Sequence, residues 1–383
     1  MTAVVVLIAA VLAVGAAKGA ARVTDDPVVW GLAGWAVPAD FGVFLAAADA
    51  VRAGDSPYPE GELLGPPHAY YVYPPPLALA VTPLTWLTNG QAGAVWTLLG
   101  IAAVIGGLLL LGVRDWRCHA IALTLAGTRE ALEYGAIGTF LVLLVGVAWH
   151  ERNRLPASAA ATGGAVVLKL FLWPLIVWHA AVGRVRTGAA AAGGAALLAI
   201  VTWAAISFHG LTEYPRVLRD LTNLEAEETY SVLALGTTLG LPRGAAQALS
   251  LLVGLALLLA TVRAGRPRGD TADRRALILT LAAAFALTPI LWHHYLVLLV
   301  VPVALASRRF SALWLVPAVG IVFEALGWYG GWADGIAPRV SVLGLIATVT
   351  AGALWATREE PAPDAATPQP DRPWARRALR ASR

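Results

Sequence analysis

The chain has 383 residues, of which 58% are hydrophobic and 14% are charged, and its mean hydropathy is +0.67. Because an ordinary soluble domain carries roughly 25% charged residues, this composition excludes a soluble globular protein. The net charge of +4 is concentrated in arginine clusters beside apolar segments and does not indicate nucleic-acid binding, and the single cysteine, Cys118, excludes an intramolecular disulfide and a cysteine-based metal cluster.

Apolar segments recur along the whole chain. A bilayer core of about 30 Å needs about 20 apolar residues per helix, and fewer where a helix is short. Long apolar runs without alternation favour helices over a β-barrel. The first helix, around 4–17, is expected to be retained, because no positive charge precedes it as in a signal peptide. The sequence therefore predicts an all-α polytopic membrane protein with about twelve transmembrane helices. After the first helix, the predicted spans are 92–113, 118–134, 135–150, 157–168, 170–182, 187–207, 245–262, 275–289, 295–306, 311–327 and 338–356.

Six arginine clusters mark the cytoplasmic side of the membrane. Placing all six on that side puts both termini inside and leaves Lys18 and Arg22 on the outer side, against the rule. We expect one transmembrane domain over 1–357 and a disordered, Arg- and Pro-rich cytoplasmic tail over 358–383. The clusters are 114–117, 151–154, 183–186, 263–275, 307–309 and the tail.

Most polar residues that are unusual in a membrane chain fall in the predicted outer loops, of which the first, about 22–91, is the longest. Charges at membrane depth are costly and usually mark function. A working site is therefore expected at the outer end of the bundle. The short spans 157–168 and 170–182 must turn back near Lys169.

Residues 39–53 in the first outer loop have helical spacing, with an apolar face suited to lie on the membrane. Asp40 begins this helix, and Asp49 points to the opposite side at about 100° per residue, so the two carboxylates do not form an acid–base pair. An isolated Asp after Pro38 is also typical of a helix N-cap. The apolar face consists of Phe41, Phe44, Leu45, Ala48 and Val51.

Several segments, taken in order, carry a resemblance to a known family. They are DFGVF (40–44), AGDSPY (53–58), YPPPLALAVTPL (73–84), LKLFLWPL (168–175) and TPILWHHYLVLLVVP (288–302). Together they resemble glycosyltransferase family 87, the actinobacterial polyprenyl-phosphate-mannose-dependent α-mannosyltransferases of the GT-C fold. The resemblance covers most of residues 38–305 and implies a GT-C-like helical bundle whose long first extracytoplasmic loop carries juxtamembrane helices.

Two segments depart from the family pattern. YGAIGTF (134–140) stands where the family tends to have Gly-Gln-x-Asn, and EETYSVL (227–233) stands where it usually has Asn-x-Ser. Both lie near the expected substrate surface, so they bear on the identity of the sugar donor or acceptor more than on the type of reaction.

The resemblance implies transfer of a sugar, mannose in the family, from a polyprenyl-phosphate donor to a cell-envelope glycolipid or lipoglycan outside the membrane, with inversion at the anomeric carbon. The acceptor hydroxyl must lose a proton as it attacks, and the resemblance places the general base at Asp40. Negative charge develops on the departing phosphate, so cations nearby assist. The candidates for binding the donor phosphate are Lys169, His293, His294 and Arg129.

Each of these cations also has a simpler interpretation. Lys169 could extend to the membrane surface from a helix end. One of the adjacent residues His293 and His294 could pack while the other faces the substrate. Arg129 and Glu133 are four residues apart and could form an ion pair within one helix.

The candidates for binding the sugar or the acceptor are Tyr71, Tyr73, Glu133 and Trp292, although Tyr71 and Tyr73 would also suit a membrane interface. No cofactor and no metal is expected, because the sugar donor is itself the lipid-linked substrate. The partners implied are the donor, a glycolipid acceptor and membrane lipids, with no nucleic acid, and the protein is expected to be a multi-pass plasma-membrane monomer with an extracytoplasmic active site.

Two other function classes remain open. A transporter or lipid flippase for a glycolipid or lipid-linked sugar would typically place paired charges and broken helices at mid-membrane, often within inverted repeats. The sequence shows no convincing repeat, and its polar residues gather at one face. The missing amides at 134–140 would suit a scaffold that has lost catalysis, whereas the presence of Asp40 and Lys169 favours an enzyme.

Overall fold

The computed structural model describes residues 37–58, 70–325 and 335–359. The predicted first helix, Lys18, Arg22 and all but the first two residues of the tail 358–383 lie outside these ranges. Every regular element in the described part of the chain is helical. The elements are α2 (Ala39–Ala53), α3 (Pro75–Val81), η2 (Thr82–Trp86), α4 (Asn89–Leu110), α5 (Trp116–Thr124), α6 (Ala126–Tyr134), α7 (Gly138–His150), α8 (Leu155–Leu168), η3 (Leu170–Leu172), α9 (Pro174–Ala181), α10 (Val185–Ala205), α11 (Tyr214–Glu225), α12 (Val232–Thr238), α13 (Arg243–Gly265), α14 (Asp270–Leu287), η4 (His293–Leu299), α15 (Val300–Ala306), η5 (Ala312–Leu315), α16 (Val319–Ala325) and α17 (Ile336–Glu359).

Four helices of the described chain, α4, α10, α13 and α17, are long and apolar enough to cross a membrane by length and composition. Helices α6 and α7 together would make a fifth span, bent by 115°. The other predicted spans correspond to shorter or more polar helices, so the prediction of about twelve spans is not shown. The prediction of a helical membrane protein is confirmed. The number of membrane crossings stays a prediction.

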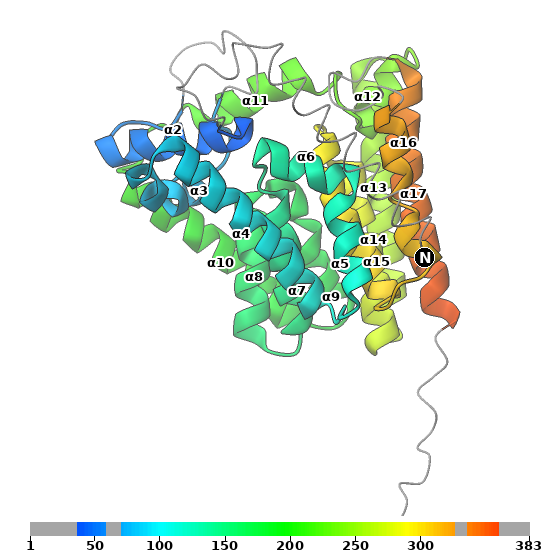
Figure 1. Ribbon diagram of the computed structural model, residues 1–383. Coiled ribbons are helices and arrows are strands. Elements are labelled where there is room, and N and C mark those ends of the chain that lie inside the picture. Colours follow the sequence, from blue (N-terminus) through cyan, green and yellow to red (C-terminus); the bar gives the residue numbers. More distant parts are fainter. Residues whose placement is uncertain (1–36, 59–69, 326–334, 360–383) are drawn as a thin grey trace, which may run out of the picture.

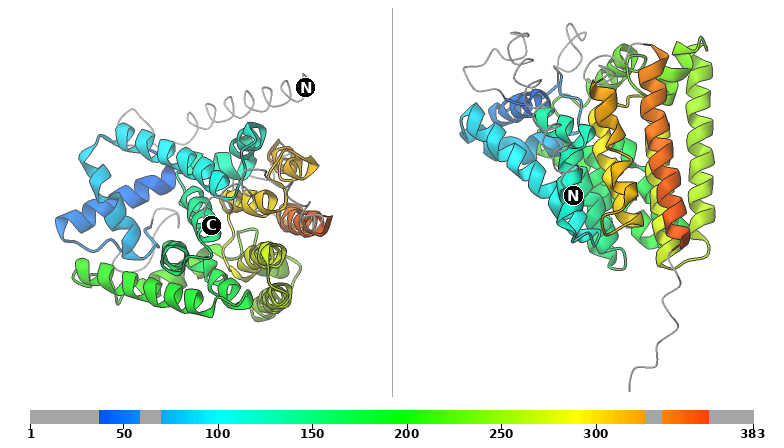
Figure 2. Two further views of the ribbon diagram at one scale, coloured as in Figure 1. Left: turned by 90° about the horizontal axis from the view of Figure 1, so that it is seen from below. Right: turned by 45° about the vertical axis from the view of Figure 1, so that its right-hand side comes forward.

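Helix α14 packs against α9, α13, α15 and α17 on the side of the bundle that Figure 1 draws at the right. From Ala276 through Ala286 almost every residue of α14 is buried, because the helix presents apolar side chains on all of its faces. Helices α10 and α13 carry exposed aliphatic side chains that could face lipid. Both helices lie at the edge of the bundle, as the view from below shows (Figure 2).

The predicted span 118–134 is not one continuous helix. The backbone of Leu125 is extended and separates α5 from α6. Helix α6 then ends at Gly135, which adopts a left-handed conformation with φ of +69° and whose carbonyl accepts a hydrogen bond from Trp96 Nε1 at 2.8 Å. A side chain at Gly135 would meet the Cβ atoms of Phe41 and Pro38 within 2.8 Å. The end of α6 at Gly135 therefore packs closely against the start of α2.

The predicted helix over 39–53 is confirmed as α2, but its apolar face does not lie on a membrane. Phe41 stacks on Trp96 with ring centroids 4.9 Å apart, and Phe44 meets Tyr73 edge-on at 5.1 Å. Burial of aromatic surface against protein explains the correction, since these rings find partners on α4 and beside α3. Asp49 lies on the opposite, exposed side and pairs with Arg52, as the helical spacing predicted.

The predicted turn near Lys169 is confirmed. Helices α8 and α9 run antiparallel, and Thr162 Oγ1 lies 2.9 Å from His179 Nε2 across the two helices. Between them Lys169 has an extended backbone, with φ of −150° and ψ of 101°. The turn brings Lys169 to the end of the bundle that also holds α2.

The arginine clusters in the described chain gather at the opposite end of the bundle (Figure 1). Arg152 pairs with Asp270 at 2.7 Å, and Arg184 with Asp273 at 2.5 Å. Asp115 accepts a hydrogen bond from the backbone N–H of Phe310 at 3.0 Å. We call this the arginine end. The end with α2, α3, α6, α11 and α12 is the site end.

Helices α4 and α7 approach so closely that Gly107 and Gly146 face each other's backbone. A Cβ atom at Gly107 would lie 2.8 Å from the carbonyl oxygen of Val142. Small residues permit such close packing of membrane helices.

We therefore expect Gly107→Ala to destabilise the protein by about 1–3 kcal/mol, because the added methyl group forces the two backbones apart. Thermal unfolding in detergent measures the effect. The matched control is Gly194→Ala in α10, where an added Cβ meets nothing within 4 Å. An equal loss in both variants would contradict the close-packing argument.

Candidate active site

Asp40 stands in the first turn of α2 and is half-buried. The N-cap of α2 is Pro38 and no side chain caps the helix, so the N-cap interpretation of Asp40 is wrong. Burial raises the pKa of Asp40 to about 6; the ammonium of Lys169 opposes this rise and the carboxylate of Glu130 adds to it. The carboxylate of Asp40 therefore does not cap the start of α2.

Lys169 is held inside the site end by two tyrosines. Its Nζ donates a hydrogen bond to Tyr73 Oη at 3.2 Å and lies 3.8 Å from the ring centroid of Tyr295. Within the described ranges Lys169 forms no direct ion pair, although it interacts electrostatically with Asp40 and Glu225. The ammonium therefore points into the protein and remains able to receive an anion.

Tyr71 and Tyr73 lie side by side but differ in their contacts. Tyr71 is buried, donates to the carbonyl of Pro74 at 2.7 Å and accepts from the backbone N–H of Ala78 at 3.0 Å. Tyr73 is half-buried, packs against Phe44 and holds Lys169. Tyr71 thus braces the start of α3, and Tyr73 belongs to the site.

The two adjacent histidines of η4 are both buried. His293 Nδ1 forms a short hydrogen bond with Glu130 of α6. His294 lies against the rings of Tyr134 and Tyr295, and its electrostatic neighbours are Lys169 and His293. His294 is therefore the histidine associated with the lysine, and His293 is the one tied to α6.

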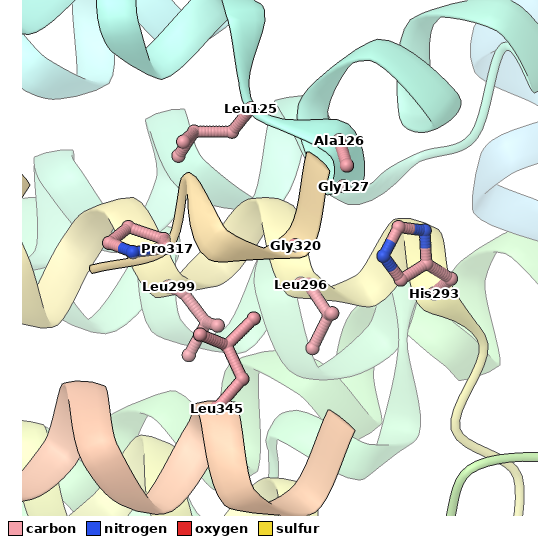
Figure 3. A pocket seen from close by; sticks show the side chains of 9 residues that line it. All are labelled: Leu125, Ala126, Gly127, His293, Leu296, Leu299, Pro317, Gly320 and Leu345. Carbon is pink, nitrogen blue, oxygen red and sulfur yellow. The ribbon is translucent and has the colours of Figure 1, made fainter. Parts of the chain in front are cut away.

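A small void lies behind His293 (Figure 3). Apart from His293 the side chains around it are apolar or small, and they come from the α5–α6 junction, η4, α17 and the segment before α16. It lacks the carboxylate and lysine described above, so it is a packing space beside the site and not the place of the chemistry. Its lining is Leu125, Ala126, Gly127, His293, Leu296, Leu299, Pro317, Gly320 and Leu345.

Arg129 does not form the expected ion pair within its helix. Its guanidinium donates to both carboxylate oxygens of Glu324 in α16, at 2.5 Å each, and Glu133 is exposed. The pair with Glu324 joins segments 195 residues apart in the chain, which helical spacing could not indicate.

Glu225 completes the site and was not singled out from the sequence. It is the last residue of α11, only 4% exposed, and its Oε2 accepts a hydrogen bond from Trp292 Nε1 at 3.3 Å. A signal existed: Val217, Leu221 and Glu225 follow each other at helical spacing, so a carboxylate occupies the buried row of an amphipathic helix. Glu130 and Tyr295 were missed as well, because their partners are distant in the chain.

These side chains form what we call the carboxylate–lysine cluster: Asp40, Tyr73, Lys169, Glu225 and Tyr295. A carboxylate with a raised pKa can take a proton near neutral pH, and an ammonium beside it can stabilise a negative charge. In the described ranges no group of three or more His, Cys, Asp or Glu side chains is arranged to hold a metal ion. The arrangement suits proton abstraction next to a bound anion.

A carboxylate–lysine cluster at one end of a helical membrane bundle suits a membrane-bound enzyme. The model of glycosyltransferase family 87 matches residues 71–291, more than half of the chain, and the protein belongs to this family. It is therefore a membrane glycosyltransferase. No curated protein matches the chain, and no solved structure does. Asp40 lies before the matched range, whereas Tyr73, Lys169 and Glu225 lie within it.

Proposed function

We propose that the protein is an inverting transferase that moves mannose from a polyprenyl-phosphate donor to a cell-envelope glycolipid or lipoglycan. The observation that carries this proposal is the meeting of Asp40 and Lys169, from distant parts of the chain, in one partly desolvated cluster with an electrostatic interaction between them. A transferase of this kind needs one group to accept a proton and another to receive a phosphate. The cluster offers both.

In the proposed reaction the carboxylate of Asp40 removes the proton of the acceptor hydroxyl. The acceptor oxygen forms a bond to the anomeric carbon of the sugar while the bond from that carbon to the phosphate oxygen breaks. The electron pair leaves with polyprenyl phosphate, whose added negative charge lies against the ammonium of Lys169. Because the displacement is direct, the anomeric configuration inverts.

The remaining candidates surround these two groups. His294 joins Lys169 in binding the phosphate, and His293, tied to Glu130, keeps η4 in place behind it. Arg129 serves the phosphate only if Glu324 gives way, since both oxygens of that carboxylate accept from it. Tyr73 and Trp292 are proposed to line the sugar, whereas Tyr71 braces the start of α3 and Glu133 is exposed.

We propose that the site end faces the outside of the plasma membrane. Arginine clusters in short loops favour the cytoplasmic side, and the clusters of the described chain gather at the other end. Twelve spans, a monomeric state and a reaction without a metal belong to the same proposal. The lipid donor would reach the cluster from the membrane, because the lipid-suited helices α4 and α10 adjoin the site end.

We expect kcat/KM to fall about tenfold per pH unit below about pH 6, because the base acts only when it is ionised. The sign follows from the raised pKa: Asp40 takes up its proton at a higher pH than an ordinary aspartate and loses activity earlier on acidification. A pH profile of initial rates between 4.5 and 8 measures it. A profile that is flat down to pH 5 would contradict the assignment.

The test of the function is transfer of radiolabel from polyprenyl-phosphate mannose by the purified protein in lipid vesicles. The proposal predicts label in a new glycolipid that survives mild acid, which cleaves the donor. If label instead crosses the vesicle membrane in unchanged donor, the protein is a transporter of the lipid-linked sugar. If another polyprenyl-phosphate sugar is the better donor, the proposed reaction type is kept and mannose is rejected as the transferred sugar.

A further inference from the structure

Glu225 is a buried carboxylate that forms no direct ion pair within the part of the chain that the structure describes. Together with Val217 and Leu221 it forms the buried row of α11, and within the described residues its side chain bonds only to the indole N–H of Trp292. Burying a carboxylate without a charged partner is costly. Burial raises the pKa of Glu225 to about 7, and the hydrogen bond from Trp292 opposes this rise. A residue kept at such a cost is expected to have a ligand.

The position of Glu225 is fixed by the segment that follows it. The guanidinium of Arg339 in α17 donates to the carbonyls of Glu227 and Thr229 at 2.6 and 3.1 Å. The backbone N–H of Tyr230 then donates to the carbonyl of Leu291 at 3.0 Å, directly before Trp292. Glu225 and Trp292 are therefore held together by two separate anchors.

Both residues border the groups that carry the proposed chemistry. Glu225 interacts electrostatically with Asp40 and with Lys169. The Trp292 side chain is half-buried.

We propose that Glu225 and Trp292 form a sugar subsite, in which the carboxylate accepts hydrogen bonds from the hydroxyl groups of a hexose. An ionised carboxylate has two oxygens with about four lone-pair positions and no donor, and the indole N–H occupies one of them. The tryptophan supplies an apolar surface for the carbon face of the ring. This inference rests on the proposed function, and the hexose belongs either to the donor or to the acceptor.

A positioning role for Glu225 is the alternative to be separated from ligand binding. If the carboxylate only orients Trp292, Glu225→Gln would preserve the function, because the amide oxygen also accepts the indole hydrogen bond. If it binds hydroxyls, the loss of charge weakens those bonds although the fold is kept. Glu228→Gln is the matched control, since it removes an exposed carboxylate three residues away.

We expect Glu225→Gln to raise KM for one of the two substrates by about 10- to 100-fold, with a smaller effect on kcat and none in Glu228→Gln. A rise confined to the donor assigns the subsite to the donor sugar, and a rise confined to the acceptor assigns it to the acceptor. Unchanged KM values for both substrates would overturn the inference.

Binding provides a readout that does not depend on transfer. The probes are farnesyl-phosphoryl mannose, farnesyl phosphate and octyl α-mannoside, added to the wild type and to Glu225→Gln in detergent. The inference predicts that one mannose-bearing probe loses affinity in the variant whereas farnesyl phosphate does not. If the wild type gains no affinity from the sugar in either probe, there is no sugar subsite. If binding behaves as predicted and no sugar is transferred, the proposed function fails and the subsite stands.

Discussion

Replacing Asp40 by Asn is expected to lower kcat by about 10²- to 10⁴-fold, because the reaction loses its general base. The amide has nearly the same shape as the carboxylate, and Asp40 makes no capping hydrogen bond, so the helix that carries it should fold normally. Its neighbours Phe41 and Phe44 hold α2 through aromatic contacts that the substitution does not touch. Steady-state transfer from the lipid-linked donor measures the effect, with the melting temperature as the check on folding.

Asp49→Asn is the matched control for this substitution. Asp49 belongs to the same helix but is exposed and pairs only with Arg52, at 3.1 Å. Exposed pairs of this kind contribute roughly 0–1 kcal/mol to stability, so both kcat and the melting temperature should stay close to those of the wild type. If Asp40→Asn kept more than a third of the activity, Asp40 would not be the base.

Replacing Lys169 by Met is expected to lower kcat by about 10²- to 10³-fold, because the departing phosphate loses its nearest positive charge. Methionine has a similar length and fits between Tyr73 and Tyr295 without a charge. The substitution should also move the acidic limb of the pH profile to higher pH, since the ammonium opposes the raised pKa of Asp40. Rates of transfer over a range of pH measure both effects.

Two further variants separate charge from packing at Lys169. Lys169→Arg keeps the charge, but its larger guanidinium with a fixed fork of donors does not reproduce the compact ammonium beside Tyr73 and Tyr295, so partial activity is expected. Tyr73→Phe keeps the ring and removes one hydrogen bond to the lysine. It should cost less than tenfold. A Lys169→Met enzyme with normal kcat and an unchanged acidic limb would remove the lysine from the mechanism.

The helical class and the separation of the two ends could be predicted from the sequence, because apolar runs and arginine clusters are local signals. The turn at Lys169 was predictable for the same reason, since two short apolar segments flank it. The break at Leu125 was not. Next to the break, Gly127 packs so closely on η4 that an added Cβ would lie 2.8 Å from the Cβ of Leu296, a contact between residues 127 and 296. Hydropathy alone does not register such a contact.

Within the site, Asp40 and Lys169 could be singled out because charges are rare in this chain. Glu130, Glu225 and Tyr295 could not be assigned to the site from the sequence. Each contacts a site residue that is distant in the chain: His293, Trp292 and Lys169, respectively. The ion pair expected between Arg129 and Glu133 is the opposite case, in which a local pattern predicted a contact that the fold replaces. Helical spacing favoured it locally, and Glu324 supplied a better partner from α16.

The most direct test of this account is the anomeric configuration of the transferred sugar. With a β-linked polyprenyl-phosphate mannose as donor, displacement assisted by Asp40 predicts an α-linked mannosyl product, which NMR of the purified glycolipid can identify. A β-linked product would mean retention of configuration, which excludes a direct displacement from the opposite face and contradicts the proposed role of Asp40 as the general base.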